Sequence, residues 1–419
     1  MRISFNTHLL FVGFFLLAVI KPINIENINR YMGMFLMLVL VLVFLISYFR
    51  AYAYRHIHSR YLFEIIIIIL FLGVNLISLW INLERFNSYS SLIFYAFASL
   101  AVWSAFFMSW LIYVQSQHTR GQWLGWGLLL FLAVVAFWQI FDYSASKQLT
   151  QYFVSADALQ AKAISSITRW HTIYGVMAAI GILVALQKLF KVQQAWWPRL
   201  FFLFLIALLT YTGVLGESRN FLFTLAIGLS LYLFRYLLIK PKIVLIFLAS
   251  AMVLFHAVII KNERLSHEYG QIFPYITKLK HTQLPHYNDF IPQINNHSLT
   301  GRADVWQQGY RLWQKSPWLG IGPGAYRVMN LDDEQHRNLH NYYFQVLVDT
   351  GITGFLLLVI LIILLLRRAY RANNLVIFIA VLGSLLFDNY LDYSFAWVFI
   401  MSWFLFVSKL NTEPKSLMS

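Results

Sequence analysis

The hydrophobic positions of the chain form long apolar runs separated by short polar stretches. The hydrocarbon core of a bilayer is crossed by about 20 consecutive apolar residues in a helix. By that measure the pattern predicts an all-α integral membrane protein with about twelve transmembrane helices. The expected spans are residues 8–21, 31–49, 62–81, 90–114, 123–141, 173–190, 198–214, 219–239, 243–260, 341–366, 375–390 and 393–408. The first is interpreted as a retained span, because no small-residue cleavage pattern follows it.

One predicted connection, residues 261–340, is much longer than the others. Its second part, Ala303 to Lys315, has Val305, Trp306, Tyr310 and Trp313 at helical spacing, which predicts an amphipathic helix lying against the membrane or the helix bundle.

The predicted organisation therefore has three parts. Spans one to nine occupy residues 1–260, the long loop with its amphipathic helix occupies residues 261–340, and residues 341–419 hold spans ten to twelve and a tail. A shorter polar connection, residues 142–172, is a candidate for a partial lid in addition to the long loop.

Basic residues orient the predicted spans, because Lys and Arg in short loops mark the cytoplasmic side. Outside the long loop, most basic residues lie in one set of alternate connections and at both chain ends: Arg2, Arg50, Arg55, Arg60, Arg120, Lys188, Lys191, Arg199, Arg235, Lys240, Lys242, Arg367, Arg368, Arg371, Lys409 and Lys415. We therefore expect both termini in the cytoplasm and the long loop outside it.

Composition agrees with a membrane protein and removes several kinds of chemistry. Hydrophobic residues make up 60% of the 419 residues and charged residues 12%, far from the values of soluble domains. The net charge of +15 lies mainly in the loops, so it does not indicate a nucleic-acid partner. The chain has no cysteine, which excludes a disulfide, a thiolate zinc site and a cysteine nucleophile.

The first candidate for chemistry is the run from Gly301 to Trp306. Arg302 falls in the first turn of the expected amphipathic helix, and an arginine at a helix N-terminus suits a phosphate. The alternative is an ordinary surface arginine that pairs with Asp304 or with lipid headgroups.

The second candidate is the glycine-rich run from Ser316 to Tyr326. Such a run can cradle a phosphate, but this one lacks the Lys-Ser ending of a nucleotide-binding loop. The composition favours a turn that directs the chain across the surface.

The third candidate is the run from Asn338 to Gln345, which continues to Gly354 at the start of the tenth span. His340 can take a proton near neutral pH, and an apolar boundary favours its neutral, basic form. The alternative is an interfacial histidine that is hydrogen-bonded to the neighbouring loop.

Two further residues map to the same membrane face. Arg219 opens the eighth span on the external side, where it could act on a substrate, pair with Glu217 or extend to the interface. Asp388 and Asp392 lie at the external end of the last hairpin, and Asp388 is nearer the apolar side. Two arginines, a histidine and a carboxylate beside the long loop suit a diphosphate donor at the membrane surface and a hydroxyl acceptor arriving from outside.

The chain resembles the O-antigen ligase and Wzy-type O-antigen polymerase superfamily. The resemblance rests on the runs Gly301 to Trp306 and Pro317 to Gly322, and on His340-Asn341 followed by Gly351 and Gly354. It implies a glycosyltransferase of the GT-C kind in the bacterial inner membrane that works without a metal or another cofactor. The implied donor is O-antigen on undecaprenyl diphosphate, the acceptor is lipid A–core oligosaccharide, and the site is periplasmic.

The resemblance also implies roles for single residues. His340 matches the proposed general base, Arg302 and Arg219 match the arginines assigned to the donor diphosphate, and Asp388 loosely matches a carboxylate near the end of the family sequence. The acidic Glu217 close to Arg219 departs from the family pattern.

Two other functions stay open at this point. A polymerase differs only in using a second lipid-linked repeat as acceptor, and the sequence does not separate it from a ligase. A lipid-linked oligosaccharide flippase belongs to another class, and its site is expected near the bilayer midplane rather than at one face.

Overall fold

The computed structural model describes residues 59–82, 118–144, 171–191, 196–216, 218–237, 300–326, 339–371 and 374–386. Within these ranges the chain is helical and contains no strand. The expected spans at 8–21, 31–49, 90–114, 243–260 and 393–408 lie outside the described residues, as does Asp388. The chain divides into two compact units, one formed by Met1–Gly228 with Gln308–Ser419 and the other by Leu229–Gln307.

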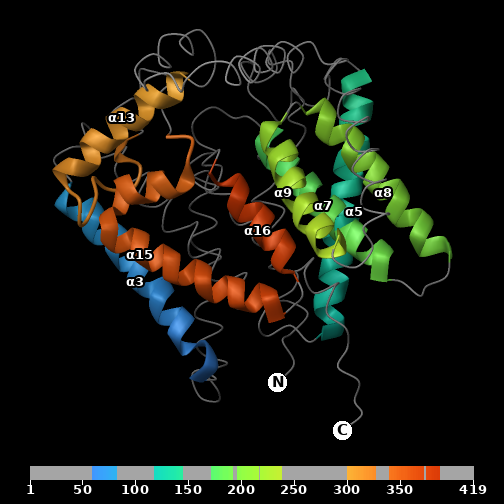
Figure 1. The fold of residues 1–419 in the computed structure, drawn as a ribbon, viewed down its shortest axis with the longest axis horizontal. Coiled ribbons are helices and arrows are strands. Elements are labelled where there is room, and N and C mark those ends of the chain that lie inside the picture. Colours follow the sequence, from blue (N-terminus) through green and yellow to red (C-terminus); the bar gives the residue numbers. More distant parts are fainter. Residues whose placement is uncertain are drawn as a thin grey trace, which may run out of the picture. The chain divides into compact units, whose positions relative to one another are not determined.

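The described helices agree with the apolar pattern to within a few residues (Figure 1). They are α3 (Ser59–Ile81), α5 (His118–Ser144), α7 (His171–Lys191), α8 (Trp196–Leu215), α9 (Arg219–Leu237), α13 (Thr300–Lys315), α15 (Tyr342–Arg371) and α16 (Leu375–Ser384). Helices are thus confirmed at seven of the predicted spans and at the predicted amphipathic segment, so the all-α class holds for the described part of the chain.

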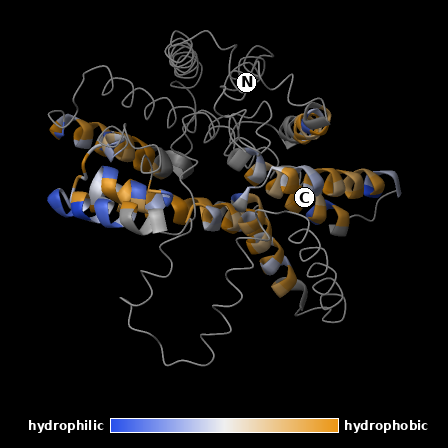
Figure 2. Ribbon diagram, turned by 90° about the horizontal axis from the view of Figure 1, so that it is seen from above, coloured by the Kyte–Doolittle hydropathy of each residue, from blue (hydrophilic) through white to orange (hydrophobic). Residues whose placement is uncertain are grey.

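Two of these helices are long and apolar enough to cross a membrane, namely α8 and the Tyr342–Arg367 part of α15. Large apolar side chains also face outward from the described helices, for example Trp80 on α3 and Trp197 on α8. Hydrophobic residues dominate most of the helical ribbon, whereas α13 is markedly more hydrophilic (Figure 2). Apolar outer faces of this kind are expected where helices contact lipid rather than water.

In the first unit, α7 packs against α8 and α5 packs against both. The Tyr174 hydroxyl of α7 and the Thr212 hydroxyl of α8 lie 2.5 Å apart, both buried. Glycines let the start of α9 approach these helices closely: a Cβ on Gly175 would meet the Ser218 side chain at 2.6 Å, and a Cβ on Gly213 would meet the Phe221 ring at 2.4 Å. Small residues serve this purpose in membrane helix packing.

Helices α3 and α15 form a second packed pair and lie side by side (Figure 1). Their contact includes buried polar groups near the end of α3. The Ser78 hydroxyl donates to the backbone oxygen of Asp349 at 2.8 Å, and the Asn82 side-chain amide donates to the backbone oxygen of Gly320 at 3.1 Å. These bonds tie α3 to α15 and to the glycine-rich turn before it.

Helix α15 is interrupted at Gly351, which the apolar pattern of the tenth span did not predict. Gly351 has φ 66° and ψ −170°, a combination essentially restricted to glycine. The backbone groups freed by the break bond to the glycine-rich turn. Ile352 N–H and Thr353 N–H donate to the oxygens of Pro317 and Trp318, and Ile321 N–H and Gly322 N–H donate to those of Val348 and Asp349.

Helix α16 ends beside the start of α15. Tyr342 N–H donates to the Leu385 oxygen at 3.0 Å, and the Tyr343 hydroxyl donates to the Leu382 oxygen at 2.8 Å. On its other side α16 contacts α7, and Gly383 lies against Ile227 of α9. The C-terminal end of α16 therefore joins the segment around His340 to the rest of the first unit.

Candidate active site

His340 lies directly before α15 and adopts a left-handed backbone conformation with φ 49°. Among the described residues it is the one non-glycine residue with positive φ. A non-glycine residue held in this region costs of order 1–3 kcal/mol and persists only when its surroundings fix it. Residues of this kind cluster at functional sites, so the half-buried His340 is the leading candidate for chemistry.

The neighbours on both sides hold His340 in place. Asn341 caps α15, because its side-chain oxygen accepts a hydrogen bond from Phe344 N–H at 3.0 Å. Leu339 is fully buried and lies against Gly309 of α13, where a Cβ would meet its side chain at 2.7 Å. The structure thus explains why histidine and asparagine are adjacent: Asn341 caps α15, and His340 directly precedes the cap.

A buried polar pair lies in the first turns of α15, behind His340. The Gln345 side-chain nitrogen donates to both carboxylate oxygens of Asp349 at 3.0 Å. The Gln345 side-chain oxygen accepts from Leu339 N–H at 3.4 Å. The sequence analysis predicted no role for these two residues. The pair could have been found from its pattern, because a carboxylate and an amide four residues apart within an apolar span can bond to each other on one helix face.

The glycine-rich run from Ser316 to Tyr326 is a turn, as its composition favoured. A phosphate cradle would need free backbone N–H groups, but those of Gly320, Ile321 and Gly322 donate to backbone oxygens of Ser316, Val348 and Asp349. The turn therefore binds the backbone groups that the break in α15 leaves without helical partners. Trp318 at its apex is exposed.

Arg219 is the first residue of α9. Ser218 precedes it as a buried cap whose hydroxyl accepts from Phe221 N–H at 3.4 Å. The missing Cβ of Gly175 leaves room for Ser218 against α7. Packing of small residues therefore fixes the point at which α9 begins, and the predicted position of Arg219 at a helix start is confirmed.

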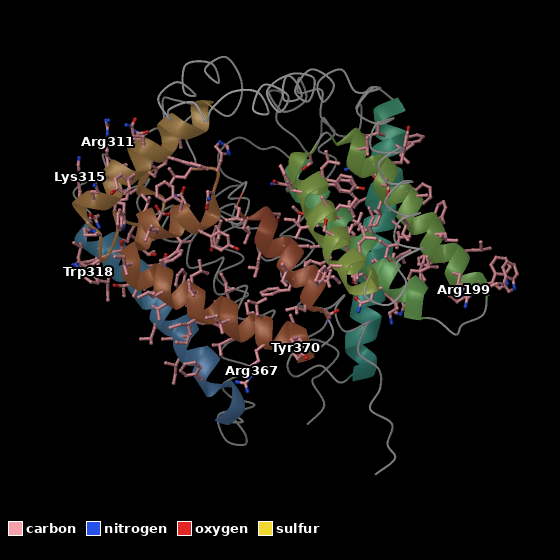
Figure 3. All side chains as sticks on the ribbon, viewed as in Figure 1. Arg199, Arg311, Lys315, Trp318, Arg367 and Tyr370 are labelled. Atoms are coloured by element: carbon pink, nitrogen blue, oxygen red, sulfur yellow. The ribbon has the colours of Figure 1, made fainter. Side chains whose placement is uncertain are left out.

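Arg302 lies in the first turn of α13, which begins at Thr300 rather than at the expected Ala303. The second half of α13 contacts the His340 segment through Gly309, and the Tyr326 hydroxyl donates to the Gln308 side chain at 3.0 Å. Further along the helix and at the turn, Arg311, Lys315 and Trp318 project outward (Figure 3). Arg302 itself belongs to the second unit, so its proximity to His340 stays a prediction.

All three described candidates stand at helix N-termini: Arg219 opens α9, Arg302 lies in the first turn of α13 and His340 precedes α15. Unpaired N–H groups and the helix dipole make such ends favourable for anions. The structure thus gives each residue a local environment that suits a phosphate or a developing negative charge.

Comparison with known proteins supports the family resemblance. Residues 200–359 match the family model described as O-Antigen ligase. This stretch runs from α8 into α15 and includes Arg219, Arg302 and His340, whereas Asp388 lies beyond it. Over this stretch the chain is similar to the O-antigen ligase and Wzy-type polymerase superfamily, which agrees with the resemblance seen in the sequence. Members of this superfamily are membrane-associated enzymes that resemble glycosyltransferases and act on lipid-linked sugars.

A curated relative supports the same resemblance. Over 73 residues the chain is 32% identical to the exopolysaccharide production protein ExoQ of Rhizobium meliloti (strain 1021). The matching segment covers 15% of this chain and 17% of ExoQ. The chain therefore spans less than a fifth of that relative's length in this match.

Proposed function

We propose that this chain belongs to the O-antigen ligase and Wzy-type polymerase superfamily and is an O-antigen ligase. It transfers O-antigen polysaccharide from undecaprenyl diphosphate to a sugar hydroxyl of lipid A–core oligosaccharide at the periplasmic face of the bacterial inner membrane. The observation that carries the proposal is the left-handed His340 at the start of α15, inside the stretch that matches the O-antigen ligase family. A constrained, half-buried imidazole beside a helix long and apolar enough to cross a membrane suits a base that acts at the membrane surface.

In the proposed reaction His340 removes the proton from the acceptor hydroxyl as its oxygen attacks the anomeric carbon of the donor. A new glycosidic bond forms, and the bond between the sugar and the diphosphate breaks. The diphosphate leaves with the electron pair, and His340 retains the proton until it is released to solvent. A single displacement of this kind inverts the anomeric configuration, and it needs neither a metal nor another cofactor.

The two arginines supply the electrostatic part of the proposal. The leaving diphosphate gains negative charge in the transition state, and fixed cationic donors stabilise that charge more than they stabilise the bound donor. Arg219 and Arg302 each stand at a helix N-terminus, where the helix dipole adds to the guanidinium charge. In this scheme Asp388 supports one of these cations or the acceptor from the end of the last hairpin.

A polymerase is the second candidate, and the ExoQ match favours it. That relative is named for exopolysaccharide production, which requires no transfer to lipid A–core. A polymerase would use the same donor, base and arginines, with a second lipid-linked repeat as acceptor.

Deleting the gene and analysing the lipopolysaccharide separates the two candidates. A ligase predicts uncapped lipid A–core together with accumulated lipid-linked polymer. Lipopolysaccharide capped by a single repeat would instead identify a polymerase, and an unchanged polymer pattern would contradict both.

The break in α15 is the feature that a lipid-linked oligosaccharide flippase would share, because transporters bind substrates at interrupted helices. In such transporters the freed backbone groups face the substrate or an ion. Here the groups around Gly351 are bonded to the turn at Pro317–Gly322. The break therefore gives little support to transport. A flippase would also form no new covalent bond when both substrates are supplied in detergent.

A further inference from the structure

The side chains of Gln345 and Asp349 form a buried pair that connects to the peptide preceding His340. Gln345 is 4% exposed and Asp349 is 8% exposed. The pair lies one helical turn apart in α15, with the Gln345 nitrogen 3.0 Å from each Asp349 carboxylate oxygen. The other end of the Gln345 amide meets Leu339 N–H at 3.4 Å. The chain of contacts thus ends at the residue directly before His340.

The carboxylate of Asp349 is not required for the bonds that hold the break in α15. Those bonds use the backbone oxygen of Asp349, which accepts from the Ser78 hydroxyl at 2.8 Å and from Gly322 N–H at 2.9 Å. Any residue at position 349 could supply that oxygen. Since a carboxylate within a membrane helix is costly and marks a functional residue by default, its side chain needs another explanation.

The Asp349 carboxylate can be explained by the hydrogen bonding of the Gln345 amide, whose two ends differ. A glutamine amide has a donor end and an acceptor end, and it can turn over by half a rotation. Both carboxylate oxygens of Asp349 accept from the nitrogen end, which leaves the oxygen end facing Leu339 N–H. The carboxylate thereby sets which end of the amide holds the Leu339 peptide.

Holding that peptide matters because His340 is in an unfavourable conformation, with φ 49°. The Asn341 cap fixes the following side of His340, and the bond from Leu339 N–H fixes the preceding side. Without the second restraint the peptide before His340 can rotate, which moves the imidazole away from its position.

We propose that Asp349 and Gln345 are positioning residues that orient His340 for removal of the acceptor proton. This role rests on the proposed function, in which His340 is the general base. Neither residue touches a substrate in this scheme. Both act through the backbone of Leu339, so they affect the chemical step rather than donor binding.

The test compares two substitutions of similar size at Asp349, using the purified full-length protein with undecaprenyl-diphosphate-linked O-antigen and lipid A–core. The Asp349→Asn side chain can turn its amide oxygen toward the Gln345 nitrogen while Leu339 N–H keeps the Gln345 oxygen engaged, so kcat should stay within a few-fold of wild type. Asp349→Leu removes the acceptor, and kcat should fall about 100-fold, as expected when a catalytic group is displaced by about 1 Å. The KM for the donor lipid should be unchanged in both variants.

Two further variants separate positioning from loss of folding. Gln345→Met removes both ends of the amide and should lower kcat to a similar extent, with the same KM. Ser78→Ala removes a hydrogen bond to the Asp349 backbone and leaves the Asp349–Gln345 pair in place. It should lower the thermal unfolding temperature while kcat stays at the wild-type value. A merely structural pair predicts instead that kcat follows the unfolding temperature in all four variants.

The results also distinguish this proposal from the function on which it rests. Wild-type kcat in Asp349→Leu and Gln345→Met, with His340→Ala inactive, would overturn the positioning role alone. An Asp349→Asn variant as slow as Asp349→Leu would also overturn it, because the charge rather than the acceptor would then matter. Full activity of His340→Ala would overturn the assignment of the base itself.

Discussion

His340 combines an ionisable ring with a backbone conformation that glycine adopts more readily. Histidine, asparagine and aspartate enter the left-handed region more often than other non-glycine residues, yet the conformation still has a cost. Asn341, Leu339 and Gln345 together provide the contacts that oppose this cost. Glycine at this position would be enough for folding. Because the position carries an imidazole instead, we infer that the side chain has a function.

Replacing His340 with glycine should therefore separate folding from activity. Glycine removes the left-handed strain and the imidazole together, so the apparent unfolding temperature should not fall. Transfer should drop by roughly 10²–10⁴-fold, the usual contribution of a general base. His340→Ala keeps the strain and should lose the same activity. A clear loss of stability in the glycine variant would show that the ring is needed for packing.

Arg302 offers a second test at the level of one side chain. Lysine preserves the charge but cannot make the bidentate contact that a guanidinium makes with a phosphate. Losing one charge-assisted hydrogen bond costs about 1.5–3 kcal/mol, so Arg302→Lys should transfer roughly 10- to 100-fold more slowly. The measurement is kcat/KM for the donor lipid, with Arg311→Lys on the outward side of the same helix as the control. Near-normal transfer by the Arg302→Lys variant would mean that only the charge is required.

At the scale of elements, the break in α15 and the turn before it form one structural unit. Gly320 and Gly351 let two backbones approach closely: a Cβ on Gly320 would lie 2.3 Å from the carbonyl carbon of Asp349, and a Cβ on Gly351 would lie equally close to that of Trp318. This contact places the start of α15, with His340, above an apolar segment. This segment is the later part of the Tyr342–Arg367 stretch, which is long and apolar enough to cross a membrane.

Alanine at Gly351 or Gly320 should therefore destabilise the protein. Each position combines positive φ with a backbone contact that cannot give way easily, so the expected cost is about 2–5 kcal/mol. Gly73 of α3 and Gly127 of α5 have nothing within 4 Å of an added Cβ, and alanine there should be neutral or stabilising by up to about 1 kcal/mol. Thermal unfolding in detergent compares the four variants. Equal stability of all four would contradict the close contact between the turn and α15.

The sequence predicted which segments are helical better than it predicted how α15 is built. Apolar runs located seven described helices to within a few residues, because a long apolar run favours a continuous helix. The break at Gly351 was not predicted, because an uninterrupted apolar run indicates one continuous helix. The role of the Gln345–Asp349 pair was not predicted, because it depends on Leu339 N–H, which lies before the helix and meets Gln345 only in the folded chain.

For the whole molecule, the distribution of basic residues predicts where each connection lies. Arg367 and Tyr370 are exposed near the C-terminal end of α15, whereas Arg311, Lys315 and Trp318 lie with α13 and the turn beside its N-terminal end (Figure 3). The basic-residue rule assigns the end with Arg367 to the cytoplasm. We therefore predict that the segment that carries His340 faces the periplasm.

Absence of cysteine makes this topology directly testable, because any cysteine introduced is the only one in the chain. Ser298→Cys in the long loop should react with a membrane-impermeant maleimide in spheroplasts. Ala372→Cys, between α15 and α16, should react only after the membrane is permeabilised. Labelling with the opposite pattern would place His340 on the cytoplasmic side and remove access to a periplasmic acceptor.

Formation of the glycosidic bond by the purified protein tests the central claim most directly. The full chain in detergent is mixed with undecaprenyl-diphosphate-linked O-antigen and lipid A–core, with no nucleotide sugar present. We predict lipid A–core that carries the polymer, with inverted configuration at the new linkage, and no product from a folded His340→Ala variant. Wild-type protein that leaves both substrates unjoined, or a His340→Ala variant that joins them at the wild-type rate, would contradict the account.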